Sequence, residues 1–290
     1  MIHVATVQTV NGTRQITGKG EISDVDYSLF MEKFDFLNEI SPVKIAYDIA
    51  IRNAREFAFF MREDQLKKRS IDEKKDLEII AIDGNRLLFN MCSSFSTFVD
   101  YSKKAVSHKE KANEDFKMFL NHTFDTSLDY RFFYKLRNFC THYSFPFTTI
   151  KASDPGIISL TCSKDHLLEY DGWGLVKNDI EKMPENVAVC SYVEQLLVII
   201  TSIMIQTHYY FAVEYFEANK AIAELAEEFE APSPVFIEDI TNKGGTIHPI
   251  PIENIASGID VLKSHPYVNV TMVKHSSEMT INPEKMHVEK

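Results

Sequence analysis

Apolar side chains along most of the chain recur at intervals of three and four residues, which is the period of an amphipathic helix. This pattern predicts helices over residues 26–69, 76–104, 111–120 and 127–144. Ser41-Pro42 is expected to divide the first of these into two helices, because serine is a good N-cap and proline suits the first helical position. A further helix, apolar on nearly all sides, is expected over 187–230. The chain is therefore predicted to be mainly helical.

The expected helix 76–104 has one continuous apolar stripe, made by Ile80, Leu87, Leu88, Met91, Phe95 and Phe98. Its other faces carry small or polar residues, among them Asn85, Arg86, Cys92, Ser93 and Ser96. Such a cluster permits close approach by another helix, but it is equally typical of an ordinary solvent-exposed face.

The two ends of the chain show a different pattern. Residues 2–22 alternate loosely between apolar and polar, and Asn11-Gly12 suits the centre of a tight turn, so we expect an N-terminal hairpin. A short strand is expected over 157–162. Pro-rich residues 231–234 read as a linker.

Beyond that linker the pattern predicts small elements: a strand over 235–240, a Gly244-Gly245 turn, a helix over 252–263 and a strand over 267–273. The last dozen residues are polar and are expected to be disordered. The predicted organisation is a hairpin at 1–25, a helical domain at 26–231 and a small α/β appendage at 232–290.

One stretch raises the question of a membrane. Residues 195–213 carry no charged side chain, and such a run reaches the roughly 18 residues at which a spanning helix becomes a candidate. Its second half contains Gln206, Thr207, His208, Tyr209 and Tyr210, which are costly in lipid without partners. We interpret it as the central buried helix of a soluble bundle, and expect no membrane association.

Composition narrows the function classes. The formal net charge is -11, which argues against a protein that holds nucleic acid by a broad basic surface. The four cysteines show neither paired spacing nor a metal-ligand pattern, so no disulfide framework or zinc site is indicated. With no signal-peptide pattern at the N-terminus, a reducing, cytoplasmic location is expected.

The candidate chemistry lies in the helix expected over 127–144. Pro146 cannot continue a helix and disfavours helical geometry at Phe145, so His142 should lie in the last turn. Asn138 lies one turn before His142 and could hydrogen-bond its imidazole. Arg137 lies about 140° round an ideal helix from His142, too far for the two to share one site easily.

An arginine and a histidine suit metal-independent RNA cleavage. Free carbonyl groups at a helix C-terminus stabilise a protonated imidazole, and histidine is a common general acid or base. The imidazole of His142 would remove the proton of a 2′-hydroxyl, whose oxygen then attacks the adjacent phosphorus. The guanidinium of Arg137 would stabilise the negative charge that develops. Neither a metal nor another cofactor is needed.

The stretch Tyr130-Arg131-Phe132-Phe133-Tyr134-Lys135-Leu136-Arg137-Asn138-Phe139-Cys140-Thr141-His142 resembles the signature helix of the HEPN superfamily. The family pattern is an arginine, often followed by asparagine, with a histidine four to six residues after the arginine. The resemblance covers residues 76–217. It implies a HEPN-like helical bundle that forms a homodimer, so that two Arg/His pairs meet in one cleft.

The resemblance further implies a toxin-like or antiviral endoribonuclease, similar to abortive-infection proteins of bacteria and their phages, with RNA as substrate and an antitoxin or regulatory protein as partner. Arg137 and His142 would be catalytic and Asn138 supporting, while Tyr143 and Arg86 are candidates for substrate binding. The alternative is a noncatalytic HEPN-like binding or scaffold module in a defence or regulatory complex. Motifs of other enzyme classes, such as a P-loop or HExxH, do not occur.

Overall fold

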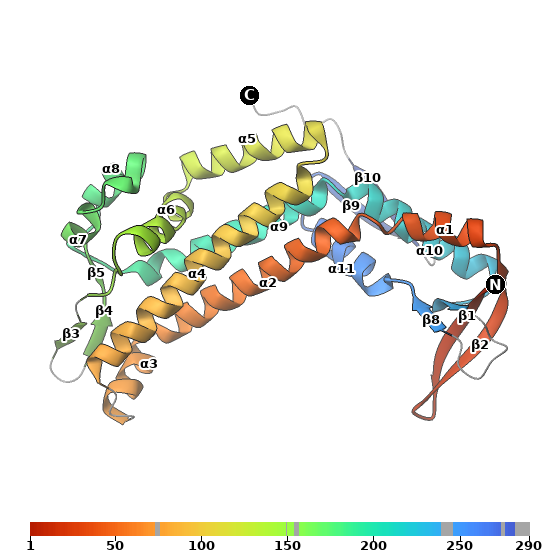
Figure 1. Ribbon diagram of the computed structural model, residues 1–290, viewed down its shortest axis with the longest axis horizontal. Helices are drawn as coiled ribbons and strands as arrows, with labels where there is room; N and C mark the ends of the chain where they lie inside the picture. Colours follow the sequence, from red (N-terminus) through yellow and green to blue (C-terminus); the bar gives the residue numbers. More distant parts are fainter. Residues whose placement is uncertain (73–75, 149, 154–156, 239–245, 274–275, 282–290) are drawn as a thin grey trace. The chain divides into compact units, whose positions relative to one another are not determined.

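The computed structural model describes residues 1–72, 76–148, 150–153, 157–238, 246–273 and 276–281. Its secondary structure is mainly helical, with a small antiparallel sheet (Figure 1), so the predicted fold class is confirmed at this level. The chain forms two compact units. The central unit comprises Pro42–Met204, and the split unit comprises Met1–Ser41 with Ile205–Lys290.

The central unit is built mostly from helices. In chain order they are α2 (Leu37–Phe60, which begins in the split unit), α3 (Glu63–Lys67), the π-helical turn η1 (Lys68–Asp72), α4 (Leu77–Val106), α5 (Glu110–Thr126), α6 (Leu128–His142), α7 (Lys164–Leu168), the 3-10 turn η2 (Asp171–Val176), α8 (Lys177–Glu181), the 3-10 turn η3 (Val189–Tyr192) and α9 (Val193–Tyr209, which ends in the split unit). Two small antiparallel pairs of strands join them, β3 (Ile150–Ser153) with β4 (Ile157–Leu160), and β5 (Cys162–Ser163) with β6 (Asn186–Val187).

Helix α4 carries the core of the central unit. Its N-cap is Asp76, whose side chain accepts a hydrogen bond from the backbone N–H of Glu78 at 3.2 Å. The predicted apolar stripe is buried at every position: Ile80, Leu87, Leu88, Met91, Phe95 and Phe98. Cys92, expected on a polar face, is also fully buried. The strong helical period of this segment therefore identified both the helix and its inward face.

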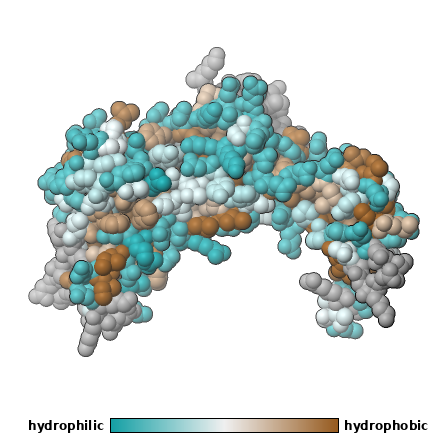
Figure 2. Space-filling view, viewed as in Figure 1, coloured by the Kyte–Doolittle hydropathy of each residue, from teal (hydrophilic) through white to brown (hydrophobic). Residues whose placement is uncertain are grey.

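The small-residue side of α4 faces α2, and the two helices run side by side (Figure 1). Between them lies a groove of about 510 Å³, where Asn53 donates to the carbonyl oxygen of Asn90 at 3.4 Å. Ile45 and Ile49 of α2 line it and remain 61% and 49% exposed. Figure 2 shows this apolar surface over α2, flanked by hydrophilic residues. Of the predicted cluster of small residues, Ser93 lines this groove, which separates the two helices here.

The predicted break at Ser41-Pro42 is wrong. Helix α2 runs through Pro42, and the chain instead turns between α1 (Asp24–Glu32) and α2, where Phe34 donates to the carbonyl of Met31. Proline removes one helical hydrogen bond, which costs less near a helix N-terminus than in its middle. Val43 is fully buried in the same turn, and its burial offsets that loss.

The single helix expected over 187–230 is also wrong. The structure has α9 and then α10 (Ala212–Glu228), separated at Phe211, whose backbone has φ -113° and ψ 14°. Phe211 is 1% exposed. Because apolar residues continue across this break and no Gly or Pro marks it, periodicity could not locate it. Helix α5, expected over 111–120, similarly extends to Thr126.

Within the described part of the chain, one helical stretch, Val189–Tyr209, is long and apolar enough to cross a membrane. Its most apolar window has a mean hydropathy of 1.6 and is 39% buried in the protein. Leu196 and Ile200 are fully buried, whereas Val198 is 56% exposed. The stretch therefore has one side buried in the protein and an apolar side that is not covered.

The split unit joins the two ends of the chain in one antiparallel sheet of order β2-β1-β7-β8. These strands are β1 (Ile2–Val10), β2 (Thr13–Ile22), β7 (Pro234–Glu238) and β8 (Thr246–Pro249). The predicted hairpin is confirmed, with positive φ at Asn11 (52°) and Gly12 (78°). The unit also contains α1, α10, α11 (Ile252–Leu262) and the pair β9 (Val268–Val273) with β10 (Ser276–Ile281).

This pairing changes the predicted organisation. The hairpin and the segment after the linker do not stand apart, because β1 pairs with β7 from Ile2 opposite Glu238 to Thr6 opposite Pro234. An isolated two-stranded hairpin is only marginally stable in water. Adding β7 buries Val4 and Phe236 completely. The predicted Gly244-Gly245 turn and most of the predicted disordered tail lie outside the described residues, while the described residues 276–281 form β10.

Helices α10 and α11 pack so closely that one position must be glycine. A Cβ atom built on Gly258 of α11 would come 2.0 Å from Cε1 of Tyr215, on α10. Tyr215 is 1% exposed and cannot move aside easily. Gly258 therefore allows this helix pair to form.

We expect Gly258→Ala to reduce the free energy of unfolding by about 1–3 kcal/mol, the usual cost of overpacking a core. Gly18→Ala is the matched control, because nothing lies within 4 Å of a Cβ at Gly18. Urea unfolding followed by circular dichroism measures both. Equal stability of the two variants would contradict the close packing.

His265 is a buried histidine held in its neutral form. It is 4% exposed, its ring stacks on Tyr209 with centroids 4.0 Å apart, and its Nδ1 accepts from the backbone N–H of Tyr267 at 3.2 Å. Nε2 lies 3.3 Å from Oε1 of Gln206 and can donate to it. Burial lowers the pKa of His265 from 6.5 to about 4.

His265 binds a proton at higher pH in the unfolded chain than in the folded one. The free energy of unfolding should therefore fall as the pH drops from 6.5 to about 4, by up to roughly 3 kcal/mol. Above pH 6.5 this residue contributes no pH dependence. In His265→Asn the loss over this range should be smaller, whereas the exposed control His108→Asn should match the wild type. Urea midpoints at several pH values test this, and identical pH profiles for all three proteins would exclude it.

Candidate functional site

The candidate site lies on α6, whose beginning and end follow local rules. Ser127 is the N-cap and its hydroxyl accepts from the backbone N–H of Tyr130 at 3.2 Å. At the other end, Tyr143 leaves helical geometry with φ -130° and ψ -72°. His142 is the last helical residue, as Pro146 predicted.

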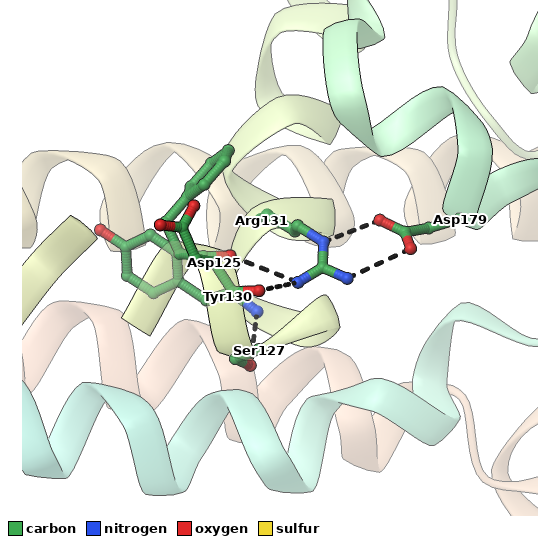
Figure 3. A network of polar contacts seen from close by, with 6 residues as sticks. Asp125, Ser127, Tyr130, Arg131 and Asp179 are labelled. Atoms are coloured by element: carbon green, nitrogen blue, oxygen red, sulfur yellow. Dashed lines mark hydrogen bonds and ion pairs between the residues drawn. The ribbon is translucent and has the colours of Figure 1, made fainter. Parts of the chain in front are cut away.

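Arg131 anchors the first turns of α6. Its Nε and Nη2 donate to the two carboxylate oxygens of Asp179 on α8, at 2.7 and 3.1 Å. Its Nη1 donates to the backbone carbonyls of Asp125 at 3.0 Å and Phe124 at 3.3 Å, near the end of α5. Figure 3 shows the guanidinium between the carboxylate of Asp179 and the backbone carbonyl groups near the end of α5. One side chain thus joins three helices and satisfies carbonyl groups at a helix terminus.

The buried face of α6 packs on Trp173. The indole ring is stacked against Phe132, with centroids 6.0 Å apart, and against Phe139, with centroids 5.6 Å apart. All three side chains are fully buried, and the indole N–H donates to the carbonyl of Leu167. This aromatic face fixes the rotation of α6 about its own axis. Residues on its other faces therefore have defined directions.

Arg137 and Asn138 lie half-buried at the edge of that face. Nη1 of Arg137 donates to Oδ1 of Asn138 at 3.4 Å, a long hydrogen bond. His142 is exposed, and its side chain makes no hydrogen bond or ion pair with a described residue. The expected bond from Asn138 to the imidazole is not formed, because the amide oxygen faces Arg137.

The helix remains regular through His142, so the spacing argument holds in the structure. Arg137 and His142 are separated by about 140° around the axis. No hydrogen bond joins the guanidinium of Arg137 to the imidazole of His142, and the two side chains leave the helix on different faces.

The end of α6 is tied instead to α7 through Tyr143. Its hydroxyl donates to Oε2 of Glu169 at 2.9 Å, and Nδ1 of His166 lies 3.0 Å from the same oxygen. Nε2 of His166 lies 3.3 Å from the carbonyl oxygen of Phe145. The Tyr143 hydroxyl and then His166 lower the pKa of Glu169, and the bond to Glu169 raises the pKa of Tyr143.

This cluster of Tyr143, His166 and Glu169 was not anticipated beyond Tyr143. The available signal was a histidine and a glutamate three residues apart, His166 in the short helix α7 and Glu169 at its C-cap. Such spacing is common, and nothing in it predicts contact with a residue twenty or more positions earlier. Only the packing of α7 beside the end of α6 brings them together.

Arg86, the other candidate for substrate binding, lies exposed on α4 and approaches Asp83 at 3.5 Å. Its polar contacts do not include the α6 residues. The neighbouring Asn85 has the clearer role, since its side chain both donates to and accepts from the backbone of Phe147, at 2.9 and 3.0 Å. It holds the segment that follows α6 against α4.

The described residues contain no group of His, Cys, Asp and Glu side chains arranged to hold a metal ion. All four cysteines are free thiols, and burial raises the pKa of each. They are therefore poor nucleophiles and poor ligands at neutral pH.

No family model matches the chain, and searches of curated proteins and of solved structures also find no match.

The Arg131–Asp179 pair should stabilise the central unit. The two side chains are only 18% and 22% exposed, and a double-mutant cycle with Ala at each position should give a coupling energy of about 1–3 kcal/mol. The exposed pair Lys44–Asp48 is the matched control and should give less than about 0.5 kcal/mol. Urea denaturation of the four proteins of each cycle measures this, and similar coupling in both pairs would refute an anchoring role.

Proposed function

We propose that this protein is a HEPN-type, metal-independent endoribonuclease whose working site is assembled from two copies of the chain. The observation that carries the proposal is the state of α6: His142 is exposed at its C-terminal turn, while Arg137 makes no ion pair with a described carboxylate. Both side chains remain available for a substrate. The resemblance of this helix to the HEPN signature supplies the reaction class.

The chemistry needs only these side chains. One imidazole takes the proton of a 2′-hydroxyl, the 2′-oxygen forms a bond to the adjacent phosphorus, and the bond from phosphorus to the 5′-oxygen breaks. The imidazolium formed in this way then gives the proton to the departing 5′-oxygen. Arg137 stabilises the charge on the five-coordinate phosphorus, held in place by Asn138. The products are a 2′,3′-cyclic phosphate end and a 5′-hydroxyl end.

The need for two copies follows from the rigidity of α6. The stack on Trp173 and the Arg131 anchor prevent the helix from turning to bring Arg137 toward His142. A second α6, facing the first, can place its imidazole beside the guanidinium of its partner. A homodimer therefore supplies two equivalent Arg/His pairs in one cleft.

A noncatalytic HEPN-like binding or scaffold module is the second candidate, and one observation favours it. The carboxylate of Glu169 accepts a hydrogen bond from Tyr143, the residue after His142. The whole chain also has a net charge of -11. A carboxylate at this position repels a phosphate backbone. In either case, a role in antiviral defence or as a toxin, with an antitoxin or regulatory partner, rests on the resemblance.

Incubation of the purified protein with single-stranded RNA or tRNA in EDTA tests the activity. We expect cleavage with cyclic-phosphate ends, reduced roughly 100-fold or more in His142→Ala and in Arg137→Ala. The exposed residues His122 and Arg55 provide matched controls, and their Ala variants should cleave as the wild type does. Intact RNA with wild-type protein would favour the binding module.

Mixing the two inactive variants tests the composite site separately. A heterodimer of His142→Ala with Arg137→Ala retains one complete pair, so the mixture should recover activity that neither variant has alone. Sedimentation should show a dimer. Active wild type with no recovery in the mixture would mean that each copy works by itself.

A further inference from the structure

The split unit contains a groove that the proposed RNA chemistry does not use. It has a volume of about 460 Å³ and lies between α1 and α10, beside the end of β2. Most of its lining is polar, and Phe30 and Leu225 form its apolar floor. Phe30 is 8% exposed and Leu225 5% exposed, whereas Leu29 at its edge is 54% exposed.

The groove has a firm wall at Phe229, the residue that ends α10. The ring of Phe229 lies against Gly20 of β2, where a Cβ atom would come 2.8 Å from Cε1. Gly20 therefore leaves room for the ring of Phe229 beside the sheet.

Carboxylates surround this floor. Glu21, Asp26, Glu224 and Glu228 line the groove with a single cation, Lys33. Asp26 accepts from the Ser23 hydroxyl at 2.6 Å, and Glu224 forms an exposed pair with Lys220 at 3.6 Å.

Glu21 and Glu228 are exposed and pair with no cation among the residues that the structure describes. The rim therefore carries an excess of negative charge that the groove itself does not balance.

We infer that this groove binds a basic amphipathic helix of a partner protein. Leucine-like side chains of the partner would cover Leu29 and the apolar floor, and Lys or Arg side chains would pair with the carboxylates. Such a helix presents its apolar anchors at positions i, i+3 or i+4 and i+7, which suits a groove between two helices. A small polycation would neutralise the carboxylates of the rim but would leave Leu29 uncovered. The apolar floor together with the acidic rim therefore favours a peptide.

The probe is a fluorescein-labelled synthetic helix of about 15 residues with leucines on one face and lysines on the other. Fluorescence anisotropy with the full-length protein measures its affinity. Two peptides of the same length separate the contributions: one has serine in place of leucine, and one has glutamate in place of lysine. The leucine–lysine peptide should bind at least about tenfold more tightly than either.

Variants of the groove residues test whether the peptide binds in the groove. Leu29→Asn and the double variant Glu21→Gln/Glu228→Gln should each weaken the leucine–lysine peptide by about tenfold. The matched control Glu217→Gln/Glu253→Gln removes the same number of charges from exposed positions of the same unit that do not line the groove, and should have little effect.

Two results would overturn the inference. Equal affinity for the serine–lysine peptide would show attraction to net charge alone. Unchanged binding in both groove variants would place the peptide elsewhere on the protein.

Discussion

The rotation of α6 about its own axis is the constraint on which the candidate site depends. Phe132 and Phe139 bury their rings against Trp173, and burying each such aromatic side chain contributes about 1.5–3 kcal/mol. The helix cannot rotate without exposing this surface. Arg137 and His142 therefore keep the directions that the helical period assigns to them, about 140° apart.

Hydrogen bonds of polar side chains also help to fix the position of α6. Arg131 joins α6 to α5 and α8, and Asn85 holds the segment after α6 against α4. Each of these side chains makes at least two hydrogen bonds to another element, as expected for partly buried polar groups. The end of α6 is thus positioned by several elements at once, while His142 itself remains unconstrained. A rigid helix with an exposed imidazole at its end suits a site that a second molecule completes.

The electrostatic surroundings limit how the proposed site would bind RNA. The chain has a net charge of -11, and Glu169 lies beside the end of the helix. In the proposed site, phosphate contacts would therefore be few and local, through Arg137 and its equivalent in a second copy. The same negative character has a different meaning in the split unit, where carboxylates surround an apolar floor. Negative charge thus opposes the proposed RNA binding in the central unit and favours the proposed basic partner in the split unit.

The sequence alone determined the features that depend on neighbours along the chain. The buried stripe of α4, the hairpin turn at Asn11-Gly12 and the position of His142 at a helix end follow from periodicity, turn chemistry and Pro146. The spacing of Arg137 and His142 was likewise readable, because a helix fixes the angle between them. Pro42 was misread because burial of nearby residues outweighs one lost hydrogen bond.

Tertiary structure alone decided which distant segments meet. The pairing of β1 with β7, the contact of Tyr143 with Glu169 and the bidentate bond of Arg131 to Asp179 join residues separated by 26 positions or more. Local sequence holds no record of such contacts, because an amphipathic helix shows which face is buried but not what covers it. Only tertiary packing determines which segment covers that face, and it therefore also determines the surroundings of the candidate site.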